Sequence, residues 1–213
     1  MTEQVAAVVA GEPVMVSEVD RREATLRGSP GAAALPARGT SEGRQLRRWI
    51  TQLIVAERLV AIEAGRRGLT DARAPGPLDV LPDATARVEI GSVPATLLDS
   101  MPLARALFAD LACDVDVPES QVNAYYRRNP GRFAQPQPDA AGWRVYRPGT
   151  GSAGQGATPL PHVRSLIEKE LRGAARRRTF ARWLDAARDD LVRLRPGFEH
   201  PGDPAQPDNT HRH

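Results

Sequence analysis

Histidines and aspartates near the end of the chain have the side chains that bind metals. His200, His211 and His213 are accompanied by Asp203 and Asp208, and imidazole nitrogens and carboxylate oxygens are ligands for zinc, nickel and copper. Ten residues separate His200 from His211, however, whereas structural zinc sites use shorter spacings. The sequence therefore leaves three interpretations open: a divalent-metal site, a disordered polar tail without cofactor, and a tail that folds on binding a partner.

A second chemical cluster consists of arginines in the last helical segment, at Arg172, Arg176, Arg177, Arg178 and Arg182. Such a row can contact phosphates or an acidic partner. Acidic residues lie nearby on either side of these arginines, at Glu168, Glu170, Asp185, Asp189 and Asp190. No aromatic side chains lie between the arginines on the same face, so the pattern favours a solvated helix face. Because the net charge of the whole chain is only +3, we expect no nucleic-acid partner.

The segment 134–160 lacks the side chains that catalysis would need, since it contains no His, Cys, Met or Phe. Gly149, Gly151 and Gly154 match the pattern G-x-G-x-x-G, but two prolines precede the next helix and no acidic partner follows. This composition is typical of a linker and not of a nucleotide site.

The rest of the chain predicts a mainly α-helical protein, because apolar residues recur at intervals of three and four. A short strand or hairpin at the N-terminus leads to Ser17, a predicted helix N-cap. A long amphipathic helix is expected from Ser41 to about Arg66, and a final helix of about thirty residues begins at His162. Between them the sequence predicts short helices over 83–90, 93–100 and 102–113, and another that opens at Pro118.

Targeting and membrane signals are not evident. The N-terminus has no basic region followed by an apolar core, and no apolar run approaches the length of a membrane span. Cys113 is the single cysteine and is expected to be buried on the apolar side of its helix. We therefore expect a cytoplasmic protein with no membrane partner.

Four segments resemble the helical chaperone module of SurA-like and PrsA-like foldases and of NifM-like maturation factors. They are "VAAVVAGEPVMVSEVDRR", "RQLRRWITQLIVAERLVAIEAGRRGL", "VPESQVNAYYRRNPGRF" and "PHVRSLIEKELRGAARRRTFARWLDAARDDL". In that family a parvulin prolyl isomerase domain follows the third segment. Here only nine residues separate Phe133 from "WRVY", which resembles the last parvulin strand. The resemblance thus implies a foldase whose isomerase is largely missing.

This resemblance implies four parts. They are a helical chaperone-like domain over 1–132, a degenerate parvulin remnant or linker over 133–160, a returning helix over 161–195 and a disordered tail over 196–213. The returning helix is expected to pack on the helix 41–66 and on the N-terminal strand, with Trp183 and Leu184 in the interface.

The function that follows is a non-catalytic chaperone or maturation factor that binds apolar segments of an unfolded or maturing protein client. Trp49, Leu59 and Tyr126 are the candidate client-binding residues, and no catalytic residue is expected. The alternatives are a metal-binding or metal-delivering accessory protein that uses the C-terminal histidines, and a residual prolyl isomerase.

Overall fold

The computed structural model describes residues 4–134, 137–138, 144–145 and 158–203. The chain divides into two compact units. Unit 1 is Met1–Cys113 together with Arg177–His213, and unit 2 is Asp114–Arg176. The two units are described separately below.

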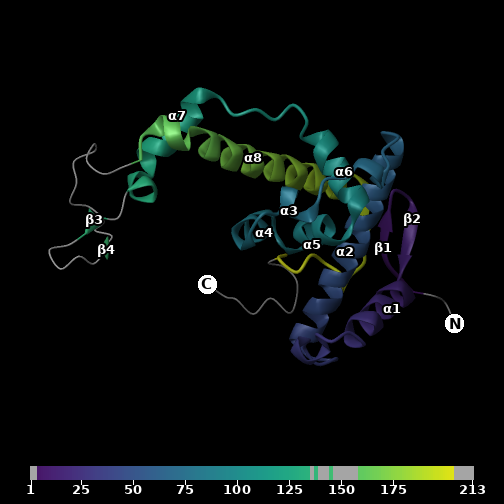
Figure 1. Ribbon diagram of the computed structural model, residues 1–213. Helices are drawn as coiled ribbons and strands as arrows, with labels where there is room; N and C mark the ends of the chain where they lie inside the picture. The colour runs from purple at the N-terminus through teal and green to yellow at the C-terminus, as the bar shows by residue number, and fades with distance from the viewer. Residues whose placement is uncertain (1–3, 135–136, 139–143, 146–157, 204–213) are drawn as a thin grey trace. The chain divides into compact units, whose positions relative to one another are not determined.

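The sheet of unit 1 contains strands from both ends of the chain (Figure 1). Strands β1 (Val5–Val9) and β2 (Glu12–Met15) form an antiparallel hairpin, and β5 (Val192–Leu194) pairs antiparallel with the other side of β1. Ala10 and Gly11 connect the hairpin with φ values of 50° and 91°. Two central residues with positive φ fit the right-handed twist of the strands. The predicted N-terminal hairpin is confirmed.

Both edges of this sheet are covered by arginine side chains. Arg58 donates from Nη1 to the carbonyl of Pro13 at 2.7 Å, and Arg193 donates from Nη1 to the carbonyl of Val192 at 2.9 Å. Pro13 itself has no backbone N–H to offer. Edge strands that are occupied in this way resist pairing with a further strand.

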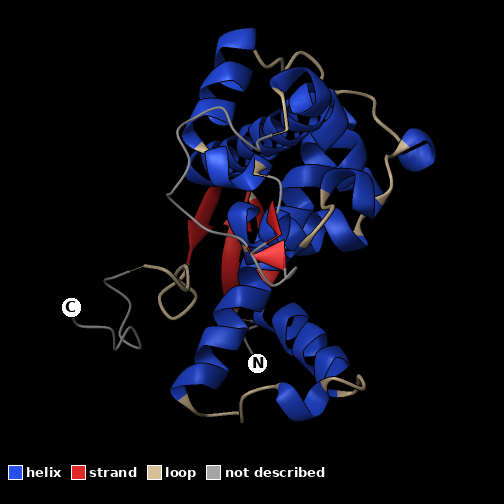
Figure 2. Ribbon diagram, turned by 60° about the vertical axis from the view of Figure 1, so that its left-hand side comes forward, coloured by secondary structure: helices blue, strands red, loops and turns tan. Residues whose placement is uncertain are grey.

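Helix α2 (Ser41–Arg66) is the central helix of unit 1, and Figure 1 shows it next to α1, α5, α6 and β1. Its N-cap is Thr40, whose Oγ1 accepts a hydrogen bond from the backbone N–H of Gly43 at 3.0 Å. In Figure 2 the helices are blue and the strands red, and most of the chain is helical. Helix α2 buries residues on several faces, among them Ile50, Leu59 and Val60.

The remaining elements of unit 1 are short. The helices are α1 (Val16–Arg27), α3 (Pro77–Val80), α4 (Ala84–Ile90), α5 (Ser92–Ser100) and α6 (Pro102–Leu111), with 3-10 turns at Ala32–Ala34 and Asp71–Arg73. Helix α8 (Leu160–Leu191) begins in unit 2 and ends in unit 1. The structure therefore confirms a mainly helical protein with a small N-terminal sheet and a long C-terminal helix.

Two local predictions are wrong. Helix α1 begins at Val16, one residue before Ser17, and its N-cap is Met15 without a side-chain hydrogen bond. Helix α6 ends at Leu111, so the chain turns before Cys113, which is exposed. The neighbouring Ala112, 1% exposed, occupies the core position that the periodicity gave to the cysteine.

Unit 2 has a small core of its own. Helix α7 (Glu119–Arg128), the 3-10 turn Pro130–Phe133 and the first half of α8 contribute to it, and its buried side chains are Val117, Val122, Phe133 and Ile167. The two-residue strands β3 (Gln137–Pro138) and β4 (Arg144–Val145) pair antiparallel, and β4 falls within the strand expected at "WRVY".

The boundaries of these units differ from the four parts expected from the resemblance. Residues 114–132 pack with the first half of α8, because Val122 and Phe133 share a core with Ile167. The division within α8 falls between Arg176 and Arg177. Within the tail expected to be disordered, residues 196–203 are described, and Phe198 packs against the core of unit 1.

Candidate functional site

A groove of about 330 Å³ in unit 1 is lined largely by apolar side chains. We call it the α2–α8 groove. Three stretches line it together with one residue of the C-terminal segment. The lining residues are Gln52, Val55, Ala56 and Leu59 of α2, Ile90–Pro94 between α4 and α5, Ala181, Leu184, Asp185 and Arg188 of α8, and His200. Its volume lies at the lower end of the range for ligand pockets.

The floor of the groove is apolar and well packed. Val55, Ala56, Ile90 and Leu184 are each at most 7% exposed, and the rim is formed partly by Val93 and Pro94 together with Ala181. Small side chains on α2 and α8 leave the hollow open. Apolar side chains of a ligand that enter the groove would be removed from water together with the partly exposed rim, which favours binding by about 25 cal/mol per Å².

Polar groups gather at the part of the groove that the C-terminal segment crosses. Gln52 donates from Nε2 to the carbonyl of Phe198 at 3.4 Å. Arg188 pairs with Asp185 at 3.3 Å. His200 accepts the N–H of Gly202 through Nδ1 at 3.0 Å, a contact that requires this nitrogen to be unprotonated.

The surroundings of His200 favour its neutral form. Partial burial of the imidazole lowers its pKa below the usual 6.5, and the positive charge of Arg188 lowers the pKa further. Asp185 and Asp203 act in the opposite direction, with smaller effects. The groove therefore presents a neutral imidazole at neutral pH, and this imidazole is able to donate or accept a hydrogen bond.

The C-terminal segment itself is fixed by a buried charge. Arg48 of α2 is 2% exposed, and its Nε lies 3.5 Å from Oε2 of Glu199. The N–H of Gly197 bonds to Glu199 and lowers its carboxyl pKa, and Arg48 adds to this effect. We call residues 195–203 the closing segment, because it holds Phe198 on the core and His200 at the groove.

The predicted client-binding residues have different surroundings. Leu59 lines the groove but is only 1% exposed, so it forms part of the floor and offers no free surface. Trp49 is partly buried at the edge of the core and donates from Nε1 to Oγ of Ser92, a rim residue, at 3.2 Å. Tyr126 belongs to unit 2, where its ring stacks on Phe133 at 5.2 Å. Trp49 and Leu59 therefore belong to one unit and Tyr126 to the other.

Of the three proposed metal ligands, the structure describes only His200. His211 and His213 lie outside the described residues, so their relation to His200 is not seen. Within residues 4–134 and 158–203 and the two short strands, no group of three or more His, Cys, Asp or Glu side chains is arranged to hold a metal ion. In that same part of the chain, no helix is both long and apolar enough to cross a membrane.

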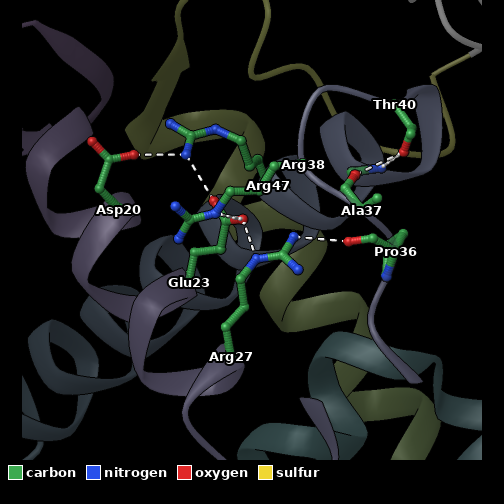
Figure 3. A network of polar contacts seen from close by, with 9 residues as sticks. Asp20, Glu23, Arg27, Pro36, Ala37, Arg38, Thr40 and Arg47 are labelled. Carbon is green, nitrogen blue, oxygen red and sulfur yellow. Dashed lines mark hydrogen bonds and ion pairs between the residues drawn. The ribbon is translucent and has the colours of Figure 1, made fainter. Parts of the chain in front are cut away.

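A network of charged side chains between α1 and α2 forms the second candidate site, and the sequence analysis did not single it out (Figure 3). Glu23 of α1 is 2% exposed and accepts hydrogen bonds from three arginines. Arg27 donates to it at 2.7 Å, Arg38 at 3.2 Å and Arg47 at 2.9 Å. Arg47 also pairs with Asp20 at 2.6 Å. These five residues are called the Glu23 network.

The network keeps Glu23 ionised despite its burial. Burial alone would raise the pKa of this carboxyl, but hydrogen bonds and charge from Arg27 and Arg47, with the charge of Arg38, lower it below the usual 4.5. An ionised carboxylate in this position holds the guanidinium groups at fixed places. The sequence gives one indication of this network, the spacing of three and four residues between Asp20, Glu23 and Arg27 on one helix.

Comparison with known protein families gives a match in the N-terminal part of the chain. Residues 5–42 match the model of a family of unknown function (DUF7158). The match covers β1, β2 and α1 and includes four residues of the Glu23 network, but none of the groove residues. No curated protein and no solved structure matches the chain.

Proposed function

We propose that the protein is a non-catalytic chaperone or maturation factor that holds an apolar segment of a protein client in the α2–α8 groove. The observation that supports this proposal is the groove itself, an apolar floor with a partly polar rim in a hollow of about 330 Å³. Concave apolar sites with a few polar groups are the usual form of binding sites. A cytoplasmic location and a foldase ancestry with a missing isomerase belong to the same proposal.

The occupied sheet edges disfavour one mode of client binding, the addition of a strand. Arg58 and Arg193 occupy the outward carbonyls of Pro13 and Val192, so the addition of a client strand to the sheet is disfavoured. Apolar side chains of the client would instead enter the groove. The groove has room for a few side chains, so each contact with a client would be weak and reversible.

A pair of variants of α8 tests this proposal. Ala181 lines the rim and Ala186 is an exposed residue of the same helix that does not line the groove. Ala181→Phe should fill the groove and weaken binding of a fluorescent, unfolded apolar peptide by about tenfold or more, whereas Ala186→Phe should leave it unchanged. Ala186→Phe should slow the aggregation of a denatured model protein as the wild type does, and Ala181→Phe should slow it less.

The result that would overturn the proposal is equal peptide binding by both variants and the wild type. Circular dichroism and thermal unfolding of each variant show whether it keeps the fold. If no peptide binds and no aggregation is slowed, the alternative of a metal-binding accessory protein is tested by titrating zinc into the full chain with and without His200→Ala.

A further inference from the structure

We infer that the hollow between α1 and α2, beside the Glu23 network, is a binding site for the phosphate group of a small molecule. This hollow encloses about 590 Å³, and three of its lining residues are arginines. The lining residues are Asp20, Glu23, Ala24, Arg38, Gly39, Gly43, Arg44 and Arg47. The site is separate from the α2–α8 groove and does not depend on the proposed function.

The network leaves donors available at this hollow. Arg27 uses Nε on Glu23 and Nη2 on the carbonyl of Pro36, at 2.7 and 2.8 Å. Arg38, by contrast, uses only Nε, and its side chain is 65% exposed. Among the residues that the structure describes, neither Nη group of Arg38 has a protein partner, and the same holds for Nη2 of Arg47. In Figure 3 the guanidinium of Arg38 lies on the same side of Glu23 as Asp20.

The local charge favours an anion. The Glu23 network beside the hollow combines three arginines with two carboxylates, so its fixed charge is positive by one. The first turn of α2 adds the positive end of its helix dipole, because Gly43 lies within that turn. Two guanidinium groups with free N–H donors suit the several oxygens of a phosphate, and a planar fork binds phosphate in bidentate geometry.

Glu23 acts in this site as a positioning residue. Its carboxylate is ionised and nearly inaccessible, and it aligns Arg38 and Arg47 through contacts of 3.2 and 2.9 Å. The ordering of two long side chains is thus already complete in the free protein, which lowers the entropy cost of binding. Asp20 opposes the anion, since it lies in the lining and pairs with Arg47.

Calorimetric titration of the full chain with inorganic phosphate, against chloride at equal ionic strength, tests the inference. We expect saturable binding of one phosphate. Arg38→Gln should weaken binding by about tenfold or more, because it removes a charged donor. Arg21→Gln, which removes the same charge from an exposed position of α1 outside the hollow, should leave the affinity unchanged.

Two further variants leave the contacts to Glu23 in place. Ala24→Glu should abolish binding because it places a carboxylate in the hollow from an exposed helix position. Asp20→Asn should strengthen binding because it removes a negative charge. The inference is wrong if phosphate gives no more heat than chloride, or if Arg21→Gln and Arg38→Gln weaken binding equally. Thermal unfolding of each variant shows that the titrated protein is folded.

Discussion

At the scale of single residues, the buried side chains of unit 1 that carry charge organise their neighbours. Glu23 collects arginines from α1, α2 and the segment between them, and Arg48 holds Glu199 of the closing segment. Glu23 and Arg48 are each 2% exposed. A buried ion pair adds little net stability compared with apolar packing, but removing one partner costs about 3 to 5 kcal/mol because the other charge stays buried.

Gly43 is a residue whose identity is fixed by the chain segment just before its helix. A Cβ at this position would lie 2.3 Å from the carbonyl oxygen of Ala37. Thr40 completes the contact, since its hydroxyl donates to that same carbonyl at 2.8 Å (Figure 3). The segment before α2 therefore crosses its first turn at a distance that only glycine permits.

The Glu23 network gives a prediction for stability and its pH dependence. Glu23→Gln should lower the free energy of unfolding at pH 7 by about 3 kcal/mol. Because the carboxyl pKa is lower in the folded chain than the usual 4.5, its contribution is complete above that pH and is lost as the pH falls through the folded value. The wild type and the variant should therefore approach equal stability in acid.

Urea unfolding between pH 3 and 7 measures this difference, which should shrink as the pH falls below about 4.5. Glu12→Gln at the exposed start of β2 is the control and should follow the wild type at every pH. A gap that stays constant across the range would show that Glu23 stabilises by packing and not by its charge.

At the scale of elements, the second half of α8 is fixed to unit 1 by an aromatic contact. Phe180 is 0% exposed and lies 5.8 Å, ring centroid to centroid, from Phe108 of α6. Trp183 packs on the outer side of Phe180 at 5.5 Å and is only partly buried. The sequence predicts Trp183 and Leu184 in this interface, and Phe180 is more deeply buried there than either.

Alanine variants at these two positions should therefore differ. Phe180→Ala should cost about 3 to 5 kcal/mol because it opens a cavity in a closed core. Trp183→Ala should cost about 1 kcal/mol, as is usual for a partly exposed side chain. Urea unfolding of both variants compares the two costs, and a larger loss for Trp183→Ala would show that Trp183 contributes more to the interface than Phe180.

Elements with long periodic patterns could be predicted from the sequence, and short or contact-dependent ones could not. The helix from Ser41 to Arg66 matches because its apolar positions repeat over many turns. Strand β5 was missed because three residues carry no period. Residues 90–94 and the closing segment contribute to the groove only through contacts with α2 and α8. Such contacts leave no pattern in the local sequence.

At the scale of the whole molecule, unit 1 is assembled from two distant parts of the chain. Residues 177–203 supply Phe180, Leu184 and Val192 to its core and β5 to its sheet. Without them β1 loses its pairing on one side, including the bond from the N–H of Arg195 to the carbonyl of Ala6 at 3.0 Å. The α2–α8 groove would also lose one wall.

A fragment of residues 1–113 should for this reason fail to fold cooperatively. It keeps α2 and most of its neighbours, but the apolar surface that Phe180 and Leu184 cover would be left in water, at about 25 cal/mol per Å². Adding a peptide of residues 177–203 should restore a cooperative thermal transition, because the peptide supplies both β5 and the missing core side chains. A peptide with Phe180→Ala should restore it only at much higher concentration. A sharp unfolding transition of the 1–113 fragment alone, unchanged by the peptide, would show that the C-terminal part is an addition to the core and not a component of it.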